Sequence, residues 1–163
     1  MALSAPERLK NTHDLGSFRC GLPSIDHYLQ RKASLAQEQK QTAVYVSCFS
    51  GTDMVAAYYT LSSGYIVRLS DSLKGLQKST PDTYPIVILG RMGISIEAQG
   101  RGHVSDLLQD AIWRCINASV SLDSTALIVH PITDRLADLC ARKIGFQPCH
   151  DLSPYTMMLP LHR

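Results

Sequence analysis

Gln99-Gly100-Arg101-Gly102 is the segment whose residue types and spacing most clearly indicate chemistry, because an amphipathic helical pattern begins directly after it. A helix N-terminus presents N–H groups without intrahelical acceptors together with the positive end of the helix dipole. Glycine residues also let an anion approach the backbone closely. The sequence therefore predicts a phosphate-binding loop over Gln99 to Ser105.

This loop matches neither of the common nucleotide-binding motifs. No Gly-Lys-Ser/Thr follows it, so it is not a P-loop. It also lacks the third glycine of the dinucleotide fingerprint and the acidic residue about 20 positions further on. A glycine-rich loop can also simply turn the chain, so the neighbouring elements must decide between the two interpretations.

The elements on either side of the loop have clear patterns. Pro85–Ser95 is an apolar strand in which Gly90 and Gly93 indicate a bulge or a close backbone approach. After the loop, one apolar stripe recurs at three- and four-residue steps and predicts a helix with one face on a core; its members are Val104, Leu107, Leu108, Ala111, Ile112 and Cys115. Arg91 is a cation within the apolar strand and needs a partner or a cleft.

The rest of the chain predicts one α/β or α+β domain around a mixed sheet. Ser24 is the expected N-cap of a first helix, and Thr133-Asp134 the expected cap of a helix that runs through Lys143 and ends at Gly145. Ser62 to Tyr84 is interpreted as a surface excursion, with a possible short helix at Asp71–Leu76. The expected strands are Ala43–Cys48 and Met54–Leu61 (a hairpin turning at Ser50–Asp53), Ala126–Val129, a strand from Phe146, and Tyr155–Leu161.

Composition limits the class of protein. The chain has 163 residues, 45% hydrophobic content and a net charge of +2, which fits one globular domain and excludes a histone-like basic coat. We expect neither a membrane span nor a signal peptide. The five cysteines are odd in number and form no C-x-x-C pair, so we expect no disulfide framework, no metal site and a reducing cytoplasm.

Four segments in order resemble the GNAT acyltransferase superfamily and, within it, the bacterial toxins of type II toxin–antitoxin pairs. They are Phe18–Leu29, Ala57–Ser62, Tyr84–Ile94 and Ile144–Phe146. The resemblance spans nearly the whole chain and implies a single GNAT N-acetyltransferase domain over residues 1–163. It implies a mostly antiparallel mixed sheet that splays between its fourth and fifth strands and is flanked by helices.

The resemblance also implies acetyl-CoA as the cosubstrate and no metal. Carried over, the fourth strand would line the pantetheine arm with Met92, Gly93 and Ile94. The loop would hold the pyrophosphate through backbone N–H groups; its residues are Gln99, Gly100, Arg101, Gly102, His103, Val104 and Ser105.

The sequence departs from the family pattern at two places. Val104 stands where the family has a small residue, so its side chain either crowds the phosphate or turns inward with the apolar stripe. The family also carries Phe-Tyr before the last Gly-Phe, and the Tyr is the usual proton donor to the CoA sulfur. Here Cys140 and Ala141 occupy these positions. Alanine has no proton to give, while Cys140 carries an S–H but has the helical position of a core residue.

The acceptor implied by the resemblance is the α-amine of an aminoacyl-tRNA, whose acetylation blocks translation. Arg91, Lys32 and Arg68 are the candidate tRNA contacts. The implied partners are a small ribbon-helix-helix antitoxin and a second copy of the chain in a homodimer.

Two alternatives stay open. One is a GNAT enzyme that acts on a small-molecule or protein amine. The other is a catalytically weakened GNAT domain that binds CoA or its antitoxin without turnover. The opening segment and the Arg91 strand favour the toxin, whereas Ala141 favours the weakened domain.

Overall fold

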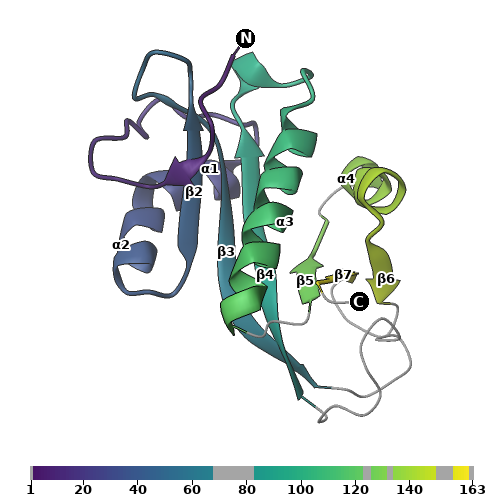
Figure 1. Ribbon diagram of the computed structural model, residues 1–163. Coiled ribbons are helices and arrows are strands. Elements are labelled where there is room, and N and C mark those ends of the chain that lie inside the picture. The colour runs from purple at the N-terminus through teal and green to yellow at the C-terminus, as the bar shows by residue number, and fades with distance from the viewer. Residues whose placement is uncertain (1, 68–82, 123–125, 132–133, 150–155, 162–163) are drawn as a thin grey trace. The chain divides into compact units, whose positions relative to one another are not determined.

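The computed structural model describes residues 2–67, 83–122, 126–131, 134–149 and 156–161 (Figure 1). Seven strands form one sheet in the order β1-β2-β3-β4-β5-β7-β6. The pairs β1–β2, β2–β3, β5–β7 and β6–β7 are antiparallel, whereas β4 and β5 are parallel. The predicted mixed, mostly antiparallel α/β sheet is therefore confirmed.

The strands and helices have the following bounds. The strands are β1 Glu7–Arg8, β2 Ala43–Cys48, β3 Val55–Val67, β4 Thr83–Ile94, β5 Ala126–Val129, β6 Gln147–Cys149 and β7 Thr156–Pro160. The helices are α1 Pro23–Arg31, α2 Ala33–Glu38, α3 His103–Leu122 and α4 Asp134–Leu139, with a short 3₁₀ turn at Ile96–Ala98 and a π-helical turn at Cys140–Ile144.

The chain packs as two compact units, which are described separately. The first comprises residues 1–62 and 90–111, and the second comprises residues 63–89 and 112–163. The strands β3 and β4 and the helix α3 each contribute residues to both units.

Two adjacent tyrosines on β3 organise the first unit. Successive strand residues point to opposite faces of a sheet. The Tyr58 hydroxyl donates to the Ile25 carbonyl of α1 at 2.7 Å, whereas the Tyr59 hydroxyl donates to Asp110 Oδ2 of α3 at 2.5 Å. The Phe18 and Tyr58 rings pack edge to face, with 5.5 Å between ring centres. The helix α1 and the first half of α3 therefore cover opposite faces of the sheet (Figure 1).

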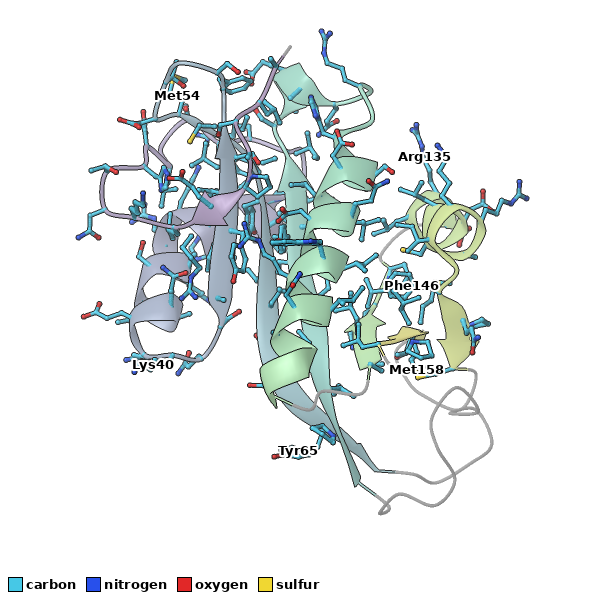
Figure 2. All side chains as sticks on the ribbon, viewed as in Figure 1. Lys40, Met54, Tyr65, Arg135, Phe146 and Met158 are labelled. Carbon is cyan, nitrogen blue, oxygen red and sulfur yellow. The ribbon has the colours of Figure 1, made fainter. Side chains whose placement is uncertain are left out.

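The second unit has its own apolar core around β5, in which all four residues are buried. Figure 2 shows Phe146 and Met158 within this unit and Arg135 of α4 pointing outward. The core is made of aliphatic and sulfur-containing side chains from β4, β5, β6 and β7, namely Ile86, Ala126, Ile128, Cys149 and Met158. Cys48, Cys115, Cys140 and Cys149 are all buried, as their apolar neighbours predict.

Several boundaries differ from the sequence prediction. Ser24 is not the N-cap: α1 starts at Pro23 after Leu22, because proline is pre-organised for the first helical position and lacks an N–H. The strand β3 continues to Val67 and β4 starts at Thr83, so both ends of the predicted excursion are strand. Residues 68–82, including Arg68 and the Asp71–Leu76 segment, lie outside the described residues.

The predicted last helix is divided. The helix α4 covers Asp134–Leu139 and continues as a wider turn through Ile144. Gly145 ends it with a φ of 93°, as the sequence predicts. Thr133 lies outside the described residues.

Candidate functional site

The glycine loop requires glycine for its backbone conformation. Gly100 has a φ of 77° and Gly102 a φ of 83°, in the left-handed region that other residues seldom adopt. A Cβ atom at either position would meet no atom within 4 Å, so crowding is not the reason for glycine. The loop therefore makes a tight turn beside open space and leads directly into α3.

The first turn of α3 carries the donors expected of an anion site. The Asp106 N–H points back to the Gly102 carbonyl at 3.5 Å, which leaves the N–H groups of His103, Val104 and Ser105 ahead of the first intrahelical bond. His103 Nδ1 lies 3.9 Å from Asp106 Oδ2. Val104 and Ser105 are partly buried. Of the seven residues predicted to bind phosphate, His103, Val104 and Ser105 thus lie in the first turn of α3, and the other four precede it.

Gln99 has a positioning role that sequence reasoning missed. Its side-chain Nε2 donates to the Ile94 carbonyl at 2.8 Å and to the Cys20 carbonyl at 2.7 Å. The Ile96 N–H also donates to the Arg19 carbonyl at 2.8 Å. The start of the loop is thereby tied to the end of β4 and to the segment before α1. The available signal was the residue type, since a side-chain amide has two N–H donors.

The segment before α1 is itself held by α1 side chains. Asp26 Oδ1 accepts the Cys20 N–H at 2.8 Å, and Gln30 Nε2 donates to the Phe18 carbonyl at 3.0 Å. Gly21 turns the chain with a φ of 100°. Asp26 of the opening segment and Gln30 just beyond it therefore fix the backbone to which Gln99 donates.

Both glycines of β4 meet close neighbours, as predicted. A Cβ on Gly93 would lie 2.7 Å from Ile25 Cγ2 and 3.1 Å from Phe18 Cζ, and one on Gly90 would lie 2.9 Å from Thr60 Oγ1. The close approach at Gly93 is therefore made by the protein's own core. Met92 is partly buried and Ile94 is buried.

Arg91 is exposed and stacks on an aromatic ring. Its guanidinium carbon lies 4.0 Å from the centre of the Tyr28 ring. Lys32 is also exposed, and its backbone N–H donates to the Tyr28 carbonyl at 2.9 Å at the end of α1. The structure thus places the Arg91 side chain on the Tyr28 ring, whereas the contact of Lys32 with Tyr28 is a backbone one.

Cys140 and Ala141 belong to the second unit. The Cys140 side chain is fully buried, and burial raises the pKa of its thiol to about 11. Its carbonyl accepts the N–H groups of Gly145 and Phe146, both at 3.0 Å. Ala141 is exposed in the same turn. These facts support the core role of Cys140 and leave Ala141 accessible.

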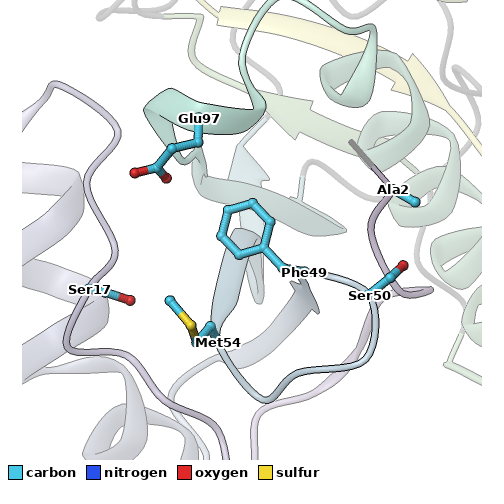
Figure 3. A pocket seen from close by; sticks show the side chains of 6 residues that line it. All are labelled: Ala2, Ser17, Phe49, Ser50, Met54 and Glu97. Atoms are coloured by element: carbon cyan, nitrogen blue, oxygen red, sulfur yellow. The ribbon is translucent and has the colours of Figure 1, made fainter.

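A hollow of about 470 Å³ lies elsewhere in the first unit, near the β2–β3 turn (Figure 3). It is lined by Ala2, Ser17, Phe49, Ser50, Met54 and Glu97. The Glu97 carboxylate accepts the Ser95 hydroxyl at 2.6 Å and remains exposed. A carboxylate repels phosphate groups, so we do not assign this hollow to a polyphosphate.

The described residues show neither a metal cluster nor a membrane-spanning helix. Within them, no group of three or more His, Cys, Asp or Glu side chains is arranged to hold a metal ion. No helix of the described chain combines the length and apolar character that a bilayer crossing requires.

Comparison with known proteins identifies the family. No family model matches the sequence. A tRNA-acetylating toxin of Mycobacterium tuberculosis (strain ATCC 25618 / H37Rv) is 36% identical over 131 residues, which cover 80% of this chain and 77% of the toxin. The chain belongs to the GNAT toxin family. The predicted resemblance to the GNAT toxins is thereby confirmed.

Solved structures of GNAT toxins share the fold. AtaT complexed with acetyl-methionyl-tRNAfMet matches with a TM-score of 0.84 and 25% identity, over 98% of this chain and 95% of AtaT. AtaTR bound with acetyl-CoA matches with a TM-score of 0.80 and 25% identity, over 98% of this chain and 94% of that one. The seven-stranded sheet of this GNAT toxin is therefore the family's sheet.

Proposed function

We propose that this GNAT toxin transfers the acetyl group of acetyl-CoA to the α-amine of an aminoacyl-tRNA, and that its 163 residues form one catalytic domain. The observation that carries the proposal is the 36% identity to a tRNA-acetylating toxin over 80% of the chain. AtaT, a structural neighbour, was solved with acetyl-methionyl-tRNAfMet.

The glycine loop and the first turn of α3 fit the pyrophosphate of acetyl-CoA. Gly100 and Gly102 keep open space beside the backbone, and the N–H groups of His103, Val104 and Ser105 precede the first intrahelical bond. Arg101 adds an exposed cation. Gln99 would act by fixing the loop, since both its amide contacts are to carbonyls of the protein.

The backbone of Met92, Gly93 and Ile94 would hold the pantetheine arm. Parallel pairing of β4 with β5 covers Ile86–Leu89, so these three residues lie beyond that register. Acetyl-CoA supplies a thioester that a neutral amine can attack. The protein must then place the amine, stabilise the oxyanion and provide a proton for the departing thiolate.

Proton donation to the departing thiolate is the step for which this sequence lacks the usual residue. Ala141 has no titratable group, and Cys140 is fully buried with a thiol pKa raised to about 11. Loss of a general acid lowers a rate by about 10²–10⁴-fold, so we expect slow transfer. The same observation favours the alternative of a weakened domain that binds CoA or antitoxin without turnover. A GNAT enzyme for a small-molecule or protein amine is the other alternative.

We further propose the partners that the family resemblance implies. These are a small ribbon-helix-helix antitoxin and a second copy of the chain in a homodimer, in the cytoplasm. The tRNA contacts would be Arg91, Lys32 and Arg68; Arg91 and Lys32 are exposed.

The test compares the unmodified chain with Ala141→Tyr, using labelled acetyl-CoA and aminoacyl-tRNA. We expect Ala141→Tyr to transfer label about 10²–10⁴-fold faster because a phenol restores a proton donor. Ala141→Phe is the matched control, since it adds the ring without the hydroxyl and should not gain activity. If neither the chain nor Ala141→Tyr labels tRNA while both bind acetyl-CoA, the proposed acceptor is wrong. Measurable turnover by the unmodified chain would refute the alternative of a weakened domain that binds CoA or antitoxin without turnover.

A further inference from the structure

The Tyr28 ring and the backbone of Arg91 are each anchored in the first unit. The Tyr28 side chain is only 9% exposed and packs in the core of the first unit with Ile25 and Leu29. The Arg91 backbone N–H donates to Thr60 Oγ1 at 2.9 Å. The guanidinium therefore rests on a fixed aromatic surface, at a distance of 4.0 Å that is well within the range of a cation–π contact.

The stacking leaves the edge of the Arg91 guanidinium available. Arg91 is exposed and its guanidinium carbon lies 4.0 Å from the centre of the ring, a separation typical of parallel stacking. In that arrangement the N–H donors point outward in the plane of the guanidinium and match two oxygens of a phosphate. No carboxylate of the described residues forms an ion pair with Arg91. Arg8 provides a contrast: it lies 5.7 Å from the Tyr45 ring, and its Nε donates to Gln37 Oε1 at 3.0 Å.

We propose that Tyr28 is a positioning residue that holds the guanidinium of Arg91 edge-on toward a phosphate of the RNA acceptor. The proposal rests on the proposed function, in which the acceptor is an aminoacyl-tRNA. Arg91 directly precedes Met92–Ile94, the strand segment assigned to the pantetheine arm. A tRNA phosphate bound by Arg91 would thus bring the aminoacyl-tRNA close to that strand.

The experiment measures the dissociation constant for unfractionated aminoacyl-tRNA at several salt concentrations, without requiring turnover. Arg91→Ala should weaken binding and reduce the slope of log K against log salt by about one, because one phosphate contact is lost. Tyr28→Leu should weaken binding by about 2- to 30-fold, the worth of a cation–π contact. Tyr28→Phe, which keeps the ring, should retain most of the RNA affinity of the unmodified chain.

A double variant separates positioning from a structural role. If Tyr28 acts through Arg91, Tyr28→Leu should cost little further RNA affinity once Arg91→Ala is present. The affinity for acetyl-CoA reports on the fold and should stay unchanged in every variant. Arg8→Ala is the matched control, since it removes a cation from another Arg–Tyr pair and should leave RNA binding unchanged.

The outcomes are distinguishable. RNA binding by Arg91→Ala with unchanged affinity and salt slope would overturn the inference and leave the proposed function standing. Additive losses from Tyr28→Leu and Arg91→Ala would overturn the positioning role of Tyr28. If the unmodified chain binds acetyl-CoA but no tRNA, the proposed acceptor and this inference fail together.

Discussion

Gly102 is the residue on which the phosphate assignment depends most directly. Its φ of 83° is accessible to Asn and Asp as well as to Gly, and a side chain there would meet no atom within 4 Å. The position is the last before α3, where the positive end of the helix dipole lies. A charge placed at this residue therefore reports on the charge of the ligand.

Gly102→Asp should weaken acetyl-CoA binding relative to Gly102→Asn. The two side chains are nearly identical in size and both tolerate the left-handed region, so their difference isolates the carboxylate charge. Repulsion of the pyrophosphate should make the dissociation constant of Gly102→Asp at least about ten-fold higher, or about 1.4 kcal/mol. Titration calorimetry at low salt measures it. Equal affinities of the two variants would contradict the loop assignment.

Residue types alone predicted some of this chemistry and missed the rest. The glycines of the loop and Arg91, a cation within an apolar strand, were recognisable because each is unusual in its local pattern. The contact of Gln99 with Cys20 joins residues 79 positions apart, and nothing local to either residue indicates it. The Tyr28 ring under Arg91 was missed for the same reason, since helical spacing predicts burial but not what lies above the ring.

At the scale of elements, α1 packs on the part of β4 that we propose to hold the pantetheine arm. Gly93 lets Ile25 and Phe18 approach the face of β4, and Phe18 is fully buried in an edge-to-face contact with the Tyr58 ring. The interior of a protein is close-packed, so one added methyl group must displace its neighbours. This contact therefore couples the opening segment to the strand.

Gly93→Ala should lower the free energy of unfolding by about 1–3 kcal/mol because its Cβ would lie 2.7 Å from Ile25 Cγ2. Urea denaturation measures the loss. An Ile25→Ala background removes the closer contact and leaves only Phe18 Cζ at 3.1 Å, so the further cost of Gly93→Ala should be smaller. A cost that is the same in both backgrounds would show that the two elements do not meet as described.

Element boundaries followed the sequence where local signals were strong. The spans Ala43–Cys48 and Ala126–Val129 match the predicted strands, since both are dense in β-branched and apolar residues. The end of β3 was missed because Ser62 and Ser63 are typical of loops, and only pairing in a sheet overrides that preference. The start of α1 was misplaced by two residues, because Ser24 competes with Pro23 as the N-terminal signal and the N-cap is Leu22.

At the scale of the whole molecule, the proposed functions divide between the two compact units. Every described residue assigned to acetyl-CoA or tRNA lies in the first unit, whereas Ala141 lies in the second. The net charge of +2 conceals exposed cations at Lys32 and Arg91. Composition alone predicted neither the division nor the missing proton donor.

The identity of the acetylated atom tests the central claim most directly. The Ala141→Tyr variant would receive acetyl-CoA with aminoacyl-tRNA, free amino acids and a lysine-containing peptide in one mixture. Mass spectrometry of the separated products then locates the acetyl group. We expect it on the α-amine of the amino acid esterified to tRNA. Acetylated peptide or free amino acid, with the aminoacyl-tRNA unmodified, would contradict the proposed function.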